Sequence, residues 1–228
     1  VGSIVRIDVP SGVLAELPSE LTQDIELEEV ELAEFDPLFS RNFLLIGTDS
    51  AIGLDPSDPA ADRDHPAGYA LADVIMLIRV DPTQSLIHMM SLPRDLYLPI
   101  FSDGMAIREE KLASAMLVGG LEKGAPTLVE TVSANFEVPI HNFVILDFFG
   151  FEQLVDLIGG VNMWFEYPIR DLASQLFINN SGCNNLDGKA SLAYVRSRKL
   201  EALVDGWWRR VGVSNDMERN ERQQDFMI

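Results

Sequence analysis

Two arginines, Arg196 and Arg198, lie two positions apart in the stretch "LDGKASLAYVRSRKL". A planar guanidinium group matches phosphate oxygens with paired hydrogen bonds, so two arginines on one face suit phosphate binding. Residues two apart share a face in extended backbone but point to opposite sides of a helix. The two side chains can therefore converge on one anion if the helix expected over residues 187–195 ends near Val195. The alternative is a pair of solvated cations that favour the C-terminal end of that helix.

A second basic group lies in the last segment, "NDMERNERQQDF". Arg219 and Arg222 are three apart and share one face of a helix expected over residues 216–228. Asp216 lies one turn before Arg219, and Gln223 follows Arg222 directly. The alternative is an exposed helix stabilised by pairs of opposite charges.

Carboxylates lie at the ends of the apolar runs that read as strands. Asp49 ends "LLIGTD", Asp73 opens "ADVIMLIRVD", and Arg94 and Asp95 follow a third run in "SLPRD". If the three strands are neighbours, two carboxylates and an arginine meet at one edge of a sheet. Such carboxylates suit Mg²⁺, which keeps waters and shares phosphate oxygens. The alternative is that Asp49 caps a loop and Asp95 pairs locally with Arg94.

The elements that would position these residues follow from hydrophobic periodicity. Strands are expected at residues 41–47, 72–81, 86–95, 143–148 and 161–166, with a possible short strand in "VRIDV". Helices are expected at residues 111–118, 125–136, 150–160, 187–195 and 216–228. The second and third of these strands should form a hairpin. Interleaved strands and helices predict the α/β class, as an αβα sandwich with a central mixed, largely antiparallel sheet flanked by helices.

Composition limits the possible functions. The chain has 228 residues, 47% of them hydrophobic, which is enough for one sizeable core or two small ones. A net charge of −19 argues against nucleic acid or anionic lipid as a bulk partner, so any anion site must be a local cluster of cations. Cys183 is the only cysteine, and the three histidines have no metal-ligand spacing. No apolar run is long enough to span a membrane.

The chain divides into two parts. Residues 1–40 read as an acidic lead-in, and residues 41–228 as one domain. Because the sequence starts at Val1, we expect an excised domain whose upstream membrane anchor has been removed. The segment "TDSAIGLDPSDPAADRDHPAG" reads as a long loop, and loops of that length are usually functional or mobile.

Taken together, the motifs resemble the LytR–CpsA–Psr family of cell-wall glycopolymer phosphotransferases, from about Phe43 to Ile228. They are "LLIGTDS", "ADVIMLIRVDP", "SLPRDLYLPI", "EEKLASAMLVGG", "VPIHNFVILDFFGFEQLVDLIGGV", "LDGKASLAYVRSRK" and "RNERQQDF". No single motif is decisive, but the order and spacing of "PRD", "YVRSR" and "RNERQQ" is highly specific.

The resemblance implies an enzyme anchored by an N-terminal helix at the extracellular face of a bacterial membrane. It would transfer a glycopolymer, with a phosphate, from a polyprenyl-pyrophosphate carrier to a hydroxyl of peptidoglycan. Mg²⁺ and an arginine cluster would hold the pyrophosphate. The lipid would lie in an apolar pocket, expected between the helices at 112–118 and 126–136 and the helix carrying Leu154, Val155 and Leu157.

The family's functional positions can be matched to this sequence motif by motif. The catalytic set is Arg94, Asp95, Arg196, Arg198 and Arg219. The metal carboxylates are Asp49 and Asp73. The further substrate-binding positions are Lys111, Asp216, Arg222 and Gln223.

The sequence departs from the family pattern at several positions. Leu71 stands where an arginine is usual, and Val74, Ala113 and Met116 replace a threonine, an asparagine and an aromatic residue. Arg63, in the long loop, is a candidate substitute for the missing arginine. Three alternatives stay open: a polyprenyl-pyrophosphate phosphatase, a non-catalytic module that binds polyprenyl phosphate or wall polymer, and a plain globular domain with salt-bridged arginines. The losses at Leu71 and Ala113 favour the binding module somewhat, but the surviving arginines still favour pyrophosphate binding, and a phosphotransferase is the leading interpretation.

Overall fold

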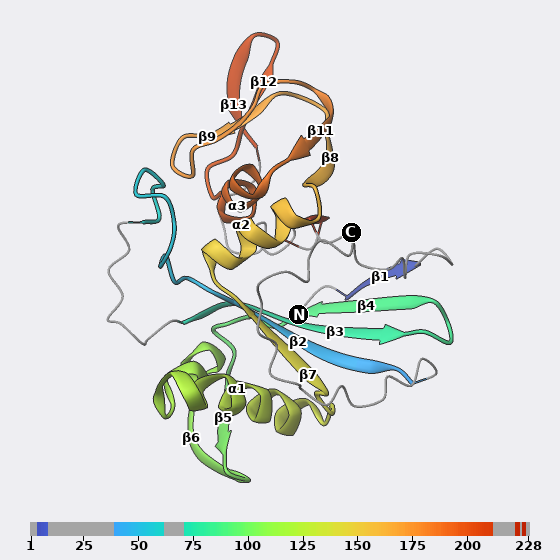
Figure 1. Ribbon diagram of the computed structural model, residues 1–228, viewed down its shortest axis with the longest axis vertical. Helices are drawn as coiled ribbons and strands as arrows, with labels where there is room; N and C mark the ends of the chain where they lie inside the picture. Colours follow the sequence, from blue (N-terminus) through green and yellow to red (C-terminus); the bar gives the residue numbers. More distant parts are fainter. Residues whose placement is uncertain (1–3, 9–38, 62–70, 212–221, 224, 227–228) are drawn as a thin grey trace, which may run out of the picture.

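The structure, a computed structural model, describes residues 4–8, 39–61, 71–211, 222–223 and 225–226. Its centre is a five-stranded β-sheet in the order β1-β4-β3-β2-β7 (Figure 1). Neighbouring strands are antiparallel except β2 and β7, which are parallel. The bounds are β1 (Ile4–Asp8), β2 (Arg41–Thr48), β3 (Ala72–Asp81), β4 (Leu86–Ser91) and β7 (Asn142–Leu146). The predicted mixed, largely antiparallel sheet is confirmed.

The apolar run at residues 41–47 forms β2, in which buried and partly exposed residues alternate. Leu44 and Ile46 are fully buried against one covering layer, as the two-residue period of a strand requires. The predicted hairpin of β3 and β4 is present, with Asp81 opposite Leu86 at its turn. The three strands that were expected to be neighbours are therefore neighbours, in the order β4-β3-β2.

A helical layer lies on one side of the sheet (Figure 1). It contains the β5–β6 hairpin, the 3₁₀ helix η2 and helix α1, and it buries Leu128 and Val132 against Leu44. The bounds are β5 (Tyr97–Ser102), β6 (Met105–Lys111), η2 (Leu112–Leu117) and α1 (Gly120–Phe136). The helix expected over 111–118 is thus a 3₁₀ helix, and the helix expected over 125–136 begins earlier. Gly119 and Gly120 both have positive φ, which ends one helix and lets the next start in a new direction.

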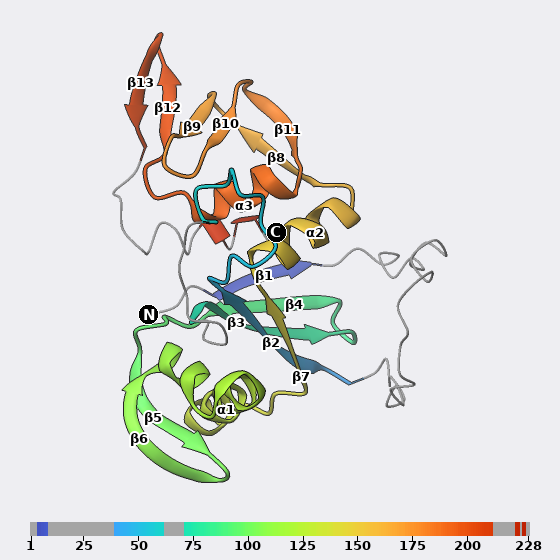
Figure 2. The same ribbon diagram turned by 60° about the vertical axis from the view of Figure 1, so that its left-hand side comes forward.

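The opposite side of the sheet carries α2 and α3 and a group of short strands (Figures 1 and 2). A second core lies there, and it includes Val155, Phe165, Leu176 and Tyr194. The helices are α2 (Phe148–Leu157) and α3 (Gly188–Arg196). The strands are β8 (Val161–Phe165), β9 (Ile169–Asp171), β10 (Leu176–Ile178), β11 (Gly182–Leu186), β12 (Glu201–Val204) and β13 (Trp207–Arg210).

These layers confirm the predicted αβα sandwich, and they correct the expected lipid pocket. Helix α1 and helix α2 cover opposite faces of the sheet, so they cannot flank a single cavity (Figures 1 and 2). Val155 is buried in the second core, whereas Leu154 and Leu157 are 43% and 56% exposed. Within the described residues, no helix has both the length and the apolar character needed to cross a membrane.

Helices α2 and α3 both start at an aspartate that caps the first turn. Asp147 accepts a hydrogen bond from the Gly150 N–H at 2.7 Å, and Asp187 accepts one from the Ala190 N–H at 2.8 Å. The helix predicted to start at Asp187 does so. The helix predicted over 150–160 begins earlier, at Phe148, because Asp147 already supplies the cap.

Asp147→Ala should lower the free energy of unfolding by about 1 kcal/mol, because it leaves the Gly150 N–H without its cap. Asp147→Asn is the matched control, since asparagine caps a helix about as well as aspartate. Urea unfolding followed by circular dichroism measures both variants. Equal stability of the alanine variant and the parent would contradict the role given to this cap.

Candidate functional site

The two arginines of the "YVRSR" motif face one cavity. Helix α3 ends at Arg196, one residue later than expected, because Ser197 adopts an extended conformation with φ −57° and ψ 133°. Arg198 and Lys199 follow in a bend, so the chain changes direction between Arg196 and Arg198. Both arginines line the same cavity of about 200 Å³. The extended backbone expected around both arginines is not found, because Arg196 is still helical, and their convergence on one anion stays a prediction.

Three segments that are distant in sequence build this cavity. Besides the two arginines, its lining residues are Pro59, Ala60, Asp171, Ala173, Ser174 and Lys199. Three of the eight lining residues are cations and one is a carboxylate, in a chain with a net charge of −19. We call this feature the arginine cavity. An anion is the ligand that such a lining favours.

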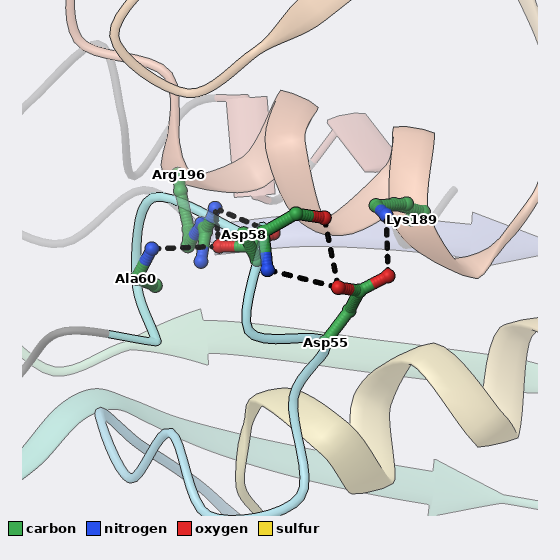
Figure 3. A network of polar contacts seen from close by, with 6 residues as sticks. Asp55, Asp58, Ala60, Lys189 and Arg196 are labelled. Carbon is green, nitrogen blue, oxygen red and sulfur yellow. Dashed lines mark hydrogen bonds and ion pairs between the residues drawn. The ribbon is translucent and has the colours of Figure 1, made fainter.

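Arg196 is held in place by a buried ion pair with Asp58 (Figure 3). Its Nη2 lies 3.0 Å and 3.4 Å from the two carboxylate oxygens, and the side chains are 11% and 6% exposed. Asp58 is itself fixed by the Ala60 N–H at 2.7 Å, and the guanidinium lies 5.0 Å from the centre of the Phe148 ring. Among the described residues, the buried Nη1 of Arg196 has no hydrogen-bond partner. Asp58 therefore fixes one edge of the guanidinium, while Nη1 on another edge is buried without a hydrogen-bond partner among the described residues.

The acidic loop that carries Asp58 packs on α2 and α3. Leu54 and Ala60 are buried against Phe148 and Leu192. At the surface, Lys189 pairs with Asp55 at 3.4 Å (Figure 3). The long loop is thus anchored on the two helices by Leu54, Asp58 and Ala60, and it lines the arginine cavity with Pro59 and Ala60.

This loop also changes the electrostatics around it. Hydrogen bonds from Ser57, followed by the charge of Lys189, lower the pKa of Asp55. Burial, together with the nearby carboxylate of Asp58, raises the pKa of Glu152 on α2. The negative charge of Asp58 therefore affects the pKa of Glu152, and Arg196 is the direct counter-ion of Asp58.

Asp171, at the end of β9, organises the turn that follows Arg196. Its Oδ2 accepts hydrogen bonds from the Ser197 hydroxyl at 2.7 Å and from the backbone N–H groups of Arg198 and Lys199 at 3.0 Å and 2.8 Å. Its Oδ1 accepts from the Ala173 N–H at 2.8 Å. The residue is 1% exposed. Burial alone would raise the pKa of Asp171, but these hydrogen bonds outweigh it and lower the pKa below the ordinary value of 3.8.

A lowered folded-state pKa has a defined effect on stability. The contribution of Asp171 is fully present above its ordinary pKa of 3.8, and it is lost as the pH falls through the lower folded-state value. The parent should therefore lose more stability than Asp171→Asn between pH 5 and pH 2.5. The difference in melting temperature between the two proteins should become smaller as the pH falls. Thermal melts of both proteins across this range test it. A difference that stays constant would show that Asp171 does not titrate as described.

Four of the predicted site residues form a second group, from the start of β3, the segment after β4 and the end of β6. Arg94 contacts Asp73 through Nη1, and its Nε lies 3.7 Å from Asp95. Lys111 then pairs with Asp95 at 2.7 Å. Positive and negative side chains alternate along this group, which we call the Arg94 group. Arg94 is not among the described residues that line the arginine cavity, so its part in a common site with Arg196 and Arg198 stays a prediction.

The predicted metal carboxylates lie at one end of the β2–β3 pair. Thr48 is opposite Ala72, so Asp49 and Asp73 both lie at this end of the two strands. Asp49 is 8% exposed, and Asp73 is the carboxylate that contacts Arg94. In the described part of the chain, no three His, Cys, Asp or Glu side chains form a group that could hold a metal by themselves. Two carboxylates fit Mg²⁺ only if waters and substrate oxygens complete its coordination.

The C-terminal residues that the structure describes lie against the end of α3. Arg222 donates through Nη2 to the backbone oxygen of Ser197, and Gln223 donates to that of Val195 at 3.4 Å. Both predicted residues are thus beside the arginine cavity. Arg219 and Asp216 lie outside the described residues, as does Arg63. Most of the helix expected over 216–228 also lies outside them.

Sequence reasoning missed Asp58, Asp171, Ser174 and Lys199. Asp58 lies in a loop with several other acidic residues, and nothing local distinguishes it from them. Asp171 offered no local signal either, because it follows Arg170 in "YPIRDLAS" and does not end an apolar run. Lys199 directly follows the arginine motif and could have been included on spacing alone.

The fold and these sites define a three-layer α/β protein with a cation-lined cavity and a neighbouring group of strand-end carboxylates. Residues 19–228 match the LytR_cpsA_psr family, and the chain belongs to this family. The probable cell wall biosynthesis protein LcpB of Corynebacterium glutamicum is 32% identical over 81% of this chain and 40% of its own length. A teichoic acid transferase of Oceanobacillus iheyensis, TagU, is 29% identical over 80% of this chain and 48% of its own length.

Solved structures share the fold. The LytR-CPS2A-psr family protein YwtF (TagT), solved with bound octaprenyl pyrophosphate lipid, aligns with a TM-score of 0.54 and 23% identity. That alignment covers 86% of this chain and 65% of the other. The chain therefore spans about half the length of the curated relatives it matches, and about two thirds of this structure.

Proposed function

We propose that this chain carries the catalytic site of a phosphotransferase that moves a glycopolymer from a polyprenyl-pyrophosphate carrier to peptidoglycan. The observation that carries the proposal is the arginine cavity. In a strongly acidic protein, Arg196 and Arg198 approach from two differently directed pieces of backbone and line one cavity with Lys199. Phosphoryl transfer needs positioned cations more than it needs covalent chemistry from the protein.

The relatives support the chemical class of the substrate. TagU is named a polyisoprenyl-teichoic acid–peptidoglycan teichoic acid transferase. The related TagT structure contains octaprenyl pyrophosphate. Both names point to a lipid pyrophosphate as donor and a wall polymer as product, which is the chemistry that an arginine-lined cavity can serve.

The reaction would place the donor pyrophosphate among the cations. A hydroxyl of peptidoglycan attacks the phosphorus next to the glycan, a new phosphodiester forms, and the bridging P–O bond breaks so that polyprenyl phosphate leaves. Arg196 and Arg198 would bind the phosphate oxygens and stabilise the charge that collects on the leaving group. Asp49 and Asp73 are the residues that would hold Mg²⁺, which supplies further neutralisation of the phosphates when bound.

The setting of the reaction follows from its substrates. A polyprenyl carrier lies in a membrane and peptidoglycan lies outside it, so the site would work at the extracellular face of the cell membrane. We include an N-terminal membrane anchor of the full-length protein in the proposal, as the family resemblance implies.

The test uses the purified chain with a short glycan on a polyprenyl pyrophosphate, with and without peptidoglycan fragments. Mass spectrometry should find a glycan–phosphate–peptidoglycan product and released polyprenyl phosphate when the acceptor is present, and both should decline when EDTA removes Mg²⁺. Release of polyprenyl phosphate without transfer would instead identify a phosphatase. Binding without turnover would identify a binding module.

A further inference from the structure

We propose that Asp171 is a positioning residue for the anion site, because it holds the turn that presents Arg198 and Lys199 to the arginine cavity. The inference rests on the proposed function, and it assigns a role to a residue outside the arginine and carboxylate motifs. Asp171 does not need to touch the ligand. It acts through the backbone of the two residues that follow Ser197.

The geometry is that of a carboxylate clamp. A single oxygen, Oδ2, accepts from the Ser197 hydroxyl and from the next two backbone N–H groups, with all three donor–acceptor distances between 2.7 Å and 3.0 Å. Three consecutive residues are thereby fixed to one point on β9. The other oxygen fixes the Ala173 N–H, in the turn that also carries Ser174. Both turns line the arginine cavity, so one buried side chain joins two of its walls.

The hydrogen bonds also explain why this carboxylate can be buried beside cations. Asp171 is 1% exposed and Ser197 is 0% exposed, so the clamp is shielded from water. A buried carboxylate that accepts several hydrogen bonds stays ionised and keeps its donors strongly ordered. Arg198 and Lys199 are exposed long side chains. Fixing their backbone limits where their charges can lie.

Simple electrostatics and positioning make opposite predictions for this residue. If Asp171 were only a nearby negative charge, its removal would strengthen binding of an anion. If it positions the cations, its removal weakens binding although the cavity becomes more positive. The sign of the change therefore separates the two roles.

Asp171→Asn is the variant to measure, because asparagine has the same shape and lacks the charge. Asp81→Asn is a matched control. Asp81 also ends a strand and is 9% exposed, and it accepts four hydrogen bonds, from the N–H and hydroxyl of Thr83 and from the backbone and side-chain N–H groups of Gln84. It serves the β3–β4 turn and does not line the arginine cavity.

Calorimetric titration with inorganic pyrophosphate should show roughly tenfold weaker binding for Asp171→Asn and parent-like binding for Asp81→Asn. In a background that carries Arg198→Ala and Lys199→Ala, adding Asp171→Asn should have no further effect on affinity. Amide hydrogen exchange measured by NMR should show faster exchange at Arg198 and Lys199 in Asp171→Asn. In Asp81→Asn it should instead be faster at Thr83 and Gln84.

The outcomes separate failure of this inference from failure of the proposed function. If the parent binds pyrophosphate but Asp171→Asn binds equally or more tightly, the positioning role is wrong and the proposed function stands. The positioning role is also wrong if the loss of affinity persists in the background without the two cationic side chains. If the parent itself does not bind pyrophosphate, the anion site fails and the positioning role fails with it.

Discussion

Arg198→Ala should weaken binding of inorganic pyrophosphate by roughly ten- to a hundredfold. A charge-assisted hydrogen bond to a phosphate contributes about 1.5–3 kcal/mol, and each 1.4 kcal/mol is a factor of ten in affinity. Arg198 is exposed, lies in the bend after α3 and lines the arginine cavity, so its truncation removes a cation from the proposed site. Calorimetric titration of the purified chain with pyrophosphate measures the change.

Two further variants make the Arg198 test specific. Arg198→Lys should also be impaired, because an ammonium group cannot supply the paired donors of a guanidinium. Arg209→Ala is the control, since Arg209 is an exposed arginine on β13, and it does not line the arginine cavity. If Arg198→Ala and Arg209→Ala both bind pyrophosphate like the parent, Arg198 is not a ligand residue, and the proposed phosphotransferase site loses its main support.

Asp58→Ala should be strongly destabilising, with a loss of about 3–5 kcal/mol in the free energy of unfolding. Removing one partner of a buried ion pair leaves the other charge without compensation. Asp58 and Arg196 are 6% and 11% exposed, so little water is available to take over the partner's role. Urea unfolding followed by tryptophan fluorescence measures the loss.

The exposed ion pair of Asp55 and Lys189 supplies a matched comparison for the buried pair of Asp58 and Arg196. Asp55→Ala removes the partner of Lys189, but these side chains are 57% and 53% exposed and solvent can replace the contact. The double variant Asp58→Leu with Arg196→Met should recover part of the stability lost in Asp58→Ala, because neither charge then remains buried alone. Equal losses in Asp55→Ala and Asp58→Ala would show that burial does not control the strength of these pairs.

The central sheet could be predicted from the sequence because its signals are local. The runs that became β2, β3 and β4 are apolar, of ordinary strand length, and bounded by Gly, Pro or Asp residues. The cap at Asp187 and the start of α3 could also be predicted, since a capping aspartate bonds to a backbone N–H within three residues of itself. The helix ends were less accurate, as the start of α1 at Gly120 shows.

Two β-hairpins that were not predicted carry a sequence signal that could have identified them. The β5–β6 and β12–β13 hairpins both turn at an Asp-Gly pair, Asp103-Gly104 and Asp205-Gly206, in which both residues have positive φ. An Asp-Gly pair between apolar segments is a strong sequence signal for a hairpin.

The partners of the arginines could not have been predicted in the same way. Asp58 and Arg196 are 138 residues apart, and the sequence offers several other acidic residues in the same loop. Asp171 reaches the arginine segment only because β9 lies beside β12 in a small sheet whose hairpins were not anticipated. The sequence indicated that both arginines could serve one site, but the end of α3 at Arg196 and the identity of the residues that hold the arginines depend on the tertiary fold.

The parallel pairing of β2 with β7 has a consequence for the order of folding. It joins Phe43 to Asn142, 99 residues further along the chain, whereas the β3–β4 hairpin closes a short turn between Asp81 and Leu86. Contacts between distant residues form slowly because loop closure is entropically costly. We therefore expect β7 to dock late. The arginine cavity is lined by segments that precede and follow β7 in the chain, so it should be among the last parts to form. Pulse-labelling hydrogen exchange should find β3 and β4 protected before Arg198 and Lys199, and simultaneous protection would contradict this order.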